Sequence, residues 1–142
     1  MRIIPFTIEQ TRKMTLDYLY CALWSTATYT ESDYEGDFEE YEEYHLDERY
    51  TTDDFLKSAF YKAMEDCRDF LTIAYNLHLI DEYADLQQIA YDFWLTRVGH
   101  GTGFWDKPEI YGIENCKKLT MIADSFKSRD VIELENGKLD IM

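Results

Sequence analysis

The sequence predicts an α+β domain that is mainly α-helical, with three to four helices and a short C-terminal β-hairpin. Apolar residues recur at helical spacing along most of the chain, and only two prolines and six glycines interrupt it. Near the C-terminus, Asn136-Gly137 separates two short apolar runs, which is typical of a hairpin turn. With no linker and no internal repeat, residues 1–142 are expected to form a single domain with one core.

The first helix is predicted over residues 8–25. Thr7 and Gln10 have the spacing of a capping box, which marks a helix N-terminus. The expected buried stripe of this helix comprises Leu16, Leu19, Tyr20, Leu23 and Trp24.

Two further helices are predicted after residue 50. The sequence TTDD at 51–54 supplies a threonine cap and two carboxylates, which the helix dipole favours at an N-terminus. The helix that follows is expected to reach about residue 77 and to bury Phe55, Ala59, Phe60, Ala63, Cys67, Phe70, Leu71 and Ala74. The next is expected over 81–97, with an apolar set of Tyr83, Leu86, Ile89, Ala90, Phe93 and Trp94.

Residues 98–112 are predicted to be an irregular loop, because they contain four glycines and a proline. A short helix is expected over about 114–126. The terminal hairpin then follows, with Asn136-Gly137 in a type I′ turn.

An acidic segment, residues 31–54, carries most of the net charge. It has one base, Arg49, and contributes −11 of the net −15. The other 118 residues hold 17 acids and 13 bases. Its twelve acids are Glu31, Asp33, Glu35, Asp37, Glu39, Glu40, Glu42, Glu43, Asp47, Glu48, Asp53 and Asp54.

Tyrosines alternate with these acids, among them Tyr34, Tyr41 and Tyr44, which are candidate aromatic contacts for a partner. The pattern fits a strand over 31–39 and a helix over 38–44, and both remain open. In a strand, alternate carboxylates stand about 6.6 Å apart, similar to successive phosphates of a nucleic-acid strand. The plain alternative is a solvated surface that keeps the protein in solution.

The charge also limits the function. Direct binding to nucleic acid needs a basic patch, and an anionic membrane repels a protein with a net charge of −15. Neither nucleic acid nor a membrane is therefore predicted as a partner. A basic protein is the expected partner. Cys21, Cys67 and Cys116 are odd in number and widely spaced, which predicts reduced thiols rather than disulfides or a metal site, and no cofactor is expected. No signal peptide or membrane span is predicted.

Three segments, YLYCALWSTA (18–27), AYDFWLTRVGHGTGFWDK (90–107) and RDVIELENGKLDI (129–141), resemble a family of small proteins encoded by tailed bacteriophages. The family shares a CALWS segment, a DFWLTRxGHGxGFWD signature and a final hairpin. The resemblance implies a phage protein acting in the cytoplasm of the bacterial host, and it supplies no activity. The acidic insertion, about 29–54, replaces a shorter and less charged loop of the family.

The signature has three interpretations, which are a structural turn, a catalytic site at His100, and a site for a small ligand or a peptide. Its candidate residues are Asp92, Trp94, Arg97, His100, Trp105 and Asp106. In the structural interpretation, Phe93, Trp94, Phe104 and Trp105 fill the core, while the charged residues form caps and an ion pair. In the functional interpretation, His100 is a general base or a ligand oriented by Asp106. No catalytic residue is assigned, because no nucleophile, HExxH motif or phosphate-loop context accompanies His100.

The predicted function is therefore binding rather than catalysis. We expect a nucleic-acid mimic that inhibits a DNA- or RNA-binding enzyme of the host, such as a restriction, CRISPR or recombination nuclease. The alternatives are an accessory or morphogenesis binding module with a solvated acidic loop, and a small enzyme that uses His100. The sequence leaves the oligomeric state open.

Overall fold

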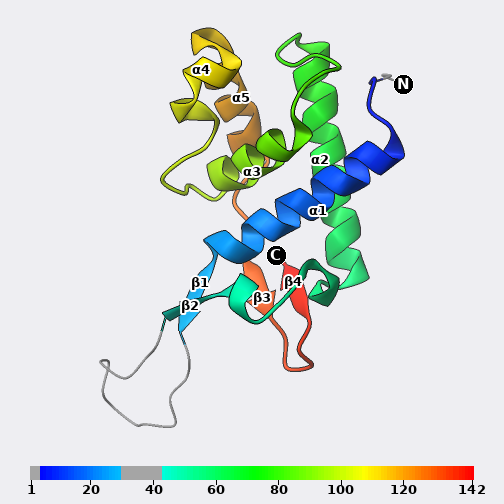
Figure 1. Cartoon of the computed structure of the whole chain (residues 1–142), viewed down its shortest axis with the longest axis vertical. Coiled ribbons are helices and arrows are strands. Elements are labelled where there is room, and N and C mark those ends of the chain that lie inside the picture. The colour runs from blue at the N-terminus through cyan, green and yellow to red at the C-terminus, as the bar shows by residue number, and fades with distance from the viewer. Residues whose placement is uncertain (1–3, 30–42) are drawn as a thin grey trace.

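The computed structural model describes residues 4–29 and 43–142 and has the predicted, mainly helical α+β architecture. The helices are α1 (Ile8–Ser25), α2 (Lys57–Asn76), α3 (Leu86–Arg97), α4 (Pro108–Tyr111) and α5 (Ile113–Ser125). Strand β1 (Ala27–Tyr29) pairs antiparallel with β2 (Glu43–His45), and β3 (Val131–Glu133) pairs antiparallel with β4 (Leu139–Ile141). In Figure 1, α1 crosses α2 and α3, with α4 and α5 beyond α3 and the strands below α1.

Helix α1 has the predicted bounds and the predicted cap. The Gln10 N–H donates to Thr7 Oγ1 at 3.0 Å, and the Thr7 N–H donates to Gln10 Oε1 at 2.8 Å. The predicted buried stripe is wrong at two positions, because Leu16 is 38% exposed and Tyr20 is 47% exposed. Helix α1 instead turns a face with Met14, Tyr18, Leu19, Cys21, Ala22 and Leu23 into the core.

Helix α2 begins later than predicted. Thr52–Asp54 forms a separate 3₁₀ turn, in which the Thr51 N–H donates to the Asp54 carboxylate. The Thr51 hydroxyl therefore does not cap α2, although the sequence predicted that it would. The chain is extended at Phe55 and Leu56, because the Leu56 N–H donates to the Leu139 carbonyl of β4 at 2.8 Å. From Ala59 to Ala74 the predicted buried face is confirmed, with Phe60 half-buried.

Helix α3 and the following connection also differ from the prediction. The Asp85 carboxylate caps α3 by accepting from the Gln88 N–H at 3.2 Å, so the helix starts at Leu86 rather than 81, and Tyr83 is 85% exposed. The connection 98–112 is not wholly irregular. It holds a 3₁₀ turn, Phe104–Asp106, and α4, which starts at Pro108 because proline fits a first helical position.

The terminal hairpin is confirmed, but its turn is not type I′. Only Gly137 has a positive φ (78°), and Asn136 does not. The Gly137 N–H donates to the Leu134 carbonyl and the Leu134 N–H to the Lys138 carbonyl, which is a type I turn closed by a glycine bulge.

The core joins α1, α2 and α3 through aromatic rings. Phe70 of α2 stacks on Phe93 of α3, with ring centroids 4.5 Å apart, and on Phe104 at 5.3 Å. Tyr18 of α1 meets Trp94 edge-on at 5.3 Å. The signature 90–107 thus supplies both a helix and the turn that closes over it.

Candidate functional site

Half of the acidic segment, including seven of its twelve acids, lies outside the described residues. This applies to Glu31, Asp33, Tyr34, Glu35, Asp37, Glu39, Glu40, Tyr41 and Glu42. The structure describes the residues on either side of 30–42. Thr28 pairs with Tyr44, and Ala27 with His45, so residues 30–42 are bracketed by an antiparallel pair of strands.

Of the remaining acids, Glu43 lies on β2, and the other four lie on two 3₁₀ turns that follow β2. Leu46 is buried and holds the first turn, Leu46–Glu48, against the body, while Asp47 and Glu48 are exposed. The second turn carries the exposed Asp53 and the half-buried Asp54. Glu48 and Asp54 also cap their own turns, at 2.6 Å to the His45 N–H and 2.8 Å to the Thr51 N–H.

Among the residues that the structure describes, no base forms an ion pair with these carboxylates. Within 4–29 and 43–142, no ion pair involves Glu43, Asp47, Glu48 or the two aspartates of the second turn. The guanidinium of Arg49 lies 3.7 Å from the centroid of the Tyr44 ring. The described end of the acidic segment therefore presents negative charge on backbone that the core holds in place.

Tyr44 fixes the turns to the rest of the molecule. Its hydroxyl donates to Glu133 of β3 at 3.1 Å, and the hydroxyl of Tyr50 donates to the same carboxylate at 2.7 Å. The Glu133 hydrogen bond and partial burial raise the pKa of Tyr50 to about 12. Tyr44, predicted as a partner contact, is thus half-buried and engaged within the protein.

A groove missed by the sequence analysis lies beside these turns, and we call it the tyrosine groove. Its cavity measures about 440 Å³. Its lining joins the exposed side of α1 to the acidic turns and to α3, and includes Leu16, Asp17, Tyr20, Asp47, Tyr50 and Tyr91. The exposure of Leu16 and Tyr20 on α1 creates this groove, and the helical periodicity gave no sign of which apolar residues would stay outside the core.

In the signature, Asp92 is the centre of a buried network. Its side chain is 1% exposed. Oδ2 accepts from Tyr111 Oη at 2.6 Å and from Gln88 Nε2 at 2.9 Å, while Oδ1 lies 2.8 Å from Lys107 Nζ. This contact is an ion pair without a hydrogen bond, because the Lys107 ammonium directs its hydrogens to Thr102, Gly103 and Asp106. Burial and the neighbouring carboxylate raise the pKa of Tyr111.

Arg97 ties four elements together. Its side chain is fully buried. It donates to Asp66 of α2 at 2.8 Å and to the Tyr18 hydroxyl of α1 at 2.9 Å. Its other donors reach the carbonyls of Phe126 and Lys127, which follow the last turn of α5. Every polar contact of this guanidinium is internal, which gives Arg97 a structural role.

Only glycine fits at position 103, because the backbone there lies against Thr96 of α3. A Cβ at this position would overlap Thr96 Oγ1 and lie 3.3 Å from Thr96 Cα. The same hydroxyl accepts the Phe104 N–H at 2.9 Å, which seats the buried Phe104 against α3. The GHGTGFWD sequence thus builds a tightly packed turn.

The tryptophans of the signature differ in environment. Trp94 is 2% exposed, and its indole N–H donates to Ser25 Oγ at 3.0 Å. Trp105 is 52% exposed, so the prediction that it fills the core is wrong. The 3₁₀ turn that buries Phe104 directs the next side chain outward.

The pairing of His100 with Asp106 is not formed. Asp106 accepts from Thr102 Oγ1 at 2.7 Å, from the Gly103 N–H at 3.1 Å and from Lys107. These bonds lower its pKa, with the Thr102 bond the largest cause. His100 is exposed, and its ring has no hydrogen-bond partner among the residues that the structure describes. The orienting contact that a general base would need is therefore missing.

Metal ligation and thiol chemistry receive no geometric support. In the described ranges, no three histidine, cysteine or acidic side chains gather to hold a metal ion. Cys21, Cys67 and Cys116 are buried free thiols, and burial raises the pKa of Cys21 and Cys67. Over the same residues, no helix has the length and apolar character needed to cross a membrane.

Comparison of the chain with protein-family models, curated proteins and solved structures finds no significant match. The resemblance to phage proteins therefore stays a prediction.

Proposed function

We propose that the protein is a phage-encoded binding protein that acts in the host cytoplasm and inhibits a basic, nucleic-acid-binding enzyme of the host. The contact surface is the acidic segment, and its carboxylates take the place of phosphates. The observation that carries this proposal is the concentration of −11 in 24 residues, whose described part is held in place by buried Leu46 and by the contacts of Tyr44 and Tyr50.

Charge and anchoring together support the proposal. A fixed anionic patch raises the rate of association with a basic cleft by about 10- to 10³-fold at low salt. A merely solvated loop needs no attachment, whereas β2 is tied to β3 through Tyr44 and to α1 through His45, and Tyr50, between the two turns, also contacts β3. The adjoining tyrosine groove adds aromatic surface of the kind that dominates binding energy at protein interfaces.

The test is capture of host proteins on the tagged chain at about 0.1 M and about 1 M salt, where the screening length falls from about 10 Å to about 3 Å. The test variant combines E39Q, E40Q, E42Q and E43Q. A matched control removes four exposed charges elsewhere, with E9Q, E65Q, E109Q and E135Q. Thermal melting of both variants verifies that they fold.

We expect a nucleic-acid-binding enzyme that elutes at high salt, is displaced by duplex DNA or RNA, and is lost only with the test variant. Equal capture by both variants, or a salt-resistant phage structural protein as the sole partner, would contradict the proposal. The second result would favour the morphogenesis module.

A further inference from the structure

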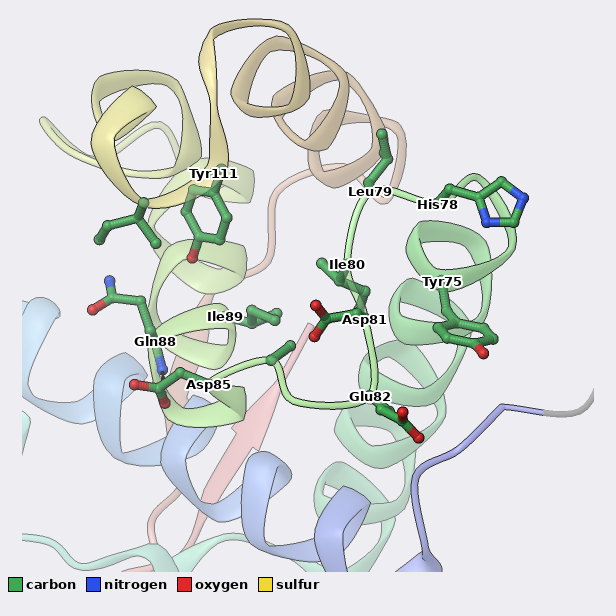
Figure 2. Close-up of a pocket in the computed structure, with 12 residues that line it drawn as sticks. Tyr75, His78, Leu79, Ile80, Asp81, Glu82, Asp85, Gln88, Ile89 and Tyr111 are labelled. Carbon is green, nitrogen blue, oxygen red and sulfur yellow. Dashed lines mark hydrogen bonds between the residues drawn. The ribbon is translucent and has the colours of Figure 1, made fainter.

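A second hollow lies at the other end of α2 from the acidic turns, and we call it the isoleucine pocket. The 20 residues of α2 separate the two places by about 30 Å of helix. The pocket has a volume of about 540 Å³, within the range of about 300–1,000 Å³ that small-molecule sites occupy. It is enclosed by the end of α2, residues 77–85, the start of α3, and α4 (Figure 2).

Part of the pocket lining is apolar. Ile89 is 2% exposed and Leu79 is 8% exposed, and with Ile80 and Ala84 they form a floor shared by α3 and the 77–85 connection. Ile110 of α4 is 52% exposed and borders the opening. An apolar floor favours a ligand with a hydrocarbon body.

One wall is fixed before any ligand binds. The Tyr111 hydroxyl and the Gln88 amide both donate to the buried Asp92 carboxylate, at 2.6 and 2.9 Å. These bonds hold both side chains in one position, so a ligand need not order them. Preorganisation of this kind lowers the entropic cost of binding.

The rim is negative. Asp81, Glu82 and Asp85 line the pocket together with His78, and its lining includes no lysine or arginine. In Figure 2 the Asp81 carboxylate points toward Ile89, whereas the Glu82 side chain points away. Asp81 Oδ1 accepts the Tyr83 N–H at 2.8 Å, and Asp85 Oδ1 accepts the Gln88 N–H. Each carboxylate is thereby oriented, and the hydrogen bonds of the described residues leave Oδ2 of both without a donor.

We propose that the isoleucine pocket binds a small organic cation, with an ammonium or guanidinium group on a short apolar body. The charged group meets Asp81 and Asp85 at the rim, and the body lies over Ile89 and Ile80. Neutral and anionic ligands of the same shape lack the charge complementarity that the rim offers. This site is independent of the proposed inhibitor function, so the failure of either leaves the other intact.

The probe is 2-phenylethylammonium, titrated into the isotope-labelled protein and followed by backbone amide NMR shifts. The matched probes are 2-phenylethanol, which has no charge, and phenylacetate, which has the opposite charge. We expect shifts centred on residues 79–89 and 110–111, and binding of the matched probes weaker by about tenfold or more.

Two variants make the test specific. D81N with D85N removes both charges but keeps the side-chain oxygens that accept from the Tyr83 and Gln88 N–H groups, so the local fold is preserved. D53N with D54N removes two charges at the far end of α2. We expect about a tenfold loss of amine affinity in the first variant and no change in the second.

Equal binding of the alcohol, equal loss in both variants, or shifts centred on the acidic turns would overturn the proposal. So would a lysine-containing peptide that binds the pocket when the free amine does not, because the occupant would then be a protein segment.

Discussion

At the scale of single residues, the buried charges of the signature explain its composition. Asp92 and Arg97 lie on α3 within six positions, yet each satisfies a different part of the fold. Asp92 holds the 102–111 connection through Lys107 and Tyr111, and Arg97 holds the end of α5. A buried charge that loses its partners costs far more than an exposed pair contributes.

Arg97→Ala is therefore expected to lower the free energy of unfolding by about 3–5 kcal/mol, because it leaves Asp66 and two helix-end carbonyls without their donor. Urea denaturation followed by circular dichroism measures the change. The control is Arg129→Ala at an exposed position, expected within about 0.5 kcal/mol of the parent. Equal stability of the Arg97 and Arg129 variants would contradict a structural role for Arg97.

The Tyr50–Glu133 contact predicts a loss of stability in alkali. The folded protein raises the pKa of Tyr50 to about 12, from an ordinary value of about 10. The native state then binds the proton more tightly than the unfolded state. The stabilisation is fully present below about pH 10 and is lost as pH rises through about 12.

Glu133→Gln is expected to bring the pKa of Tyr50 back toward about 10, since it removes the adjacent negative charge. NMR of ring-labelled tyrosine, assigned with Tyr50→Phe, measures this titration. A Tyr50 that titrates near its ordinary value in the parent protein would show that the contact with Glu133 does not form in solution.

At the scale of elements, the end of α2 is unusual. His78 has a φ of 60°, and the Leu79 N–H bonds to the Ala74 carbonyl while the His78 N–H bonds to that of Tyr75. This is the Schellman arrangement, in which the left-handed position is normally glycine. The strained residue also lines the isoleucine pocket.

His78→Gly is expected to raise the free energy of unfolding by about 0.5–1 kcal/mol, because glycine adopts this backbone conformation without a Cβ clash. Thermal and urea unfolding measure it. His78→Ala serves as the control, since alanine keeps the clash and should give no gain. A destabilised glycine variant would mean that the imidazole itself contributes contacts that outweigh the strain.

Local signals in the sequence predicted the elements well and their ends less well. The Thr7–Gln10 capping box fixed the start of α1, because both partners lie within one turn. The start of α2 was missed because the Leu56 N–H bonds to Leu139, 83 positions later in the chain. The turn at Asn136-Gly137 was assigned to the wrong type, since both hairpin turns need a residue with positive φ and Gly137 serves either one, at the third position of type I′ or at the fourth position of the observed turn.

At the scale of the whole molecule, charge and core are separated along the chain. Helices α1 to α3 and the signature form the packed body. The acidic segment contacts it through its own second half, in which β2 pairs with β1 and Leu46 of the first 3₁₀ turn is buried. The position of the acidic segment in the candidate site was predictable, because charges can be counted in the sequence. The groove of Leu16 and Tyr20, the Glu133 anchor and the partners of Asp92 were not, because they arise from contacts between distant segments.

The central claim is that the acidic segment competes with nucleic acid for a basic cleft. The most direct measurement is the fluorescence anisotropy of a labelled duplex bound to the captured host enzyme, as this protein is titrated in. We predict that the parent protein and the E9Q/E65Q/E109Q/E135Q control release the duplex stoichiometrically. The E39Q/E40Q/E42Q/E43Q variant should need a concentration about tenfold higher, or more, for the same release. A ternary complex that retains the duplex, or equal release by both variants, would contradict the claim.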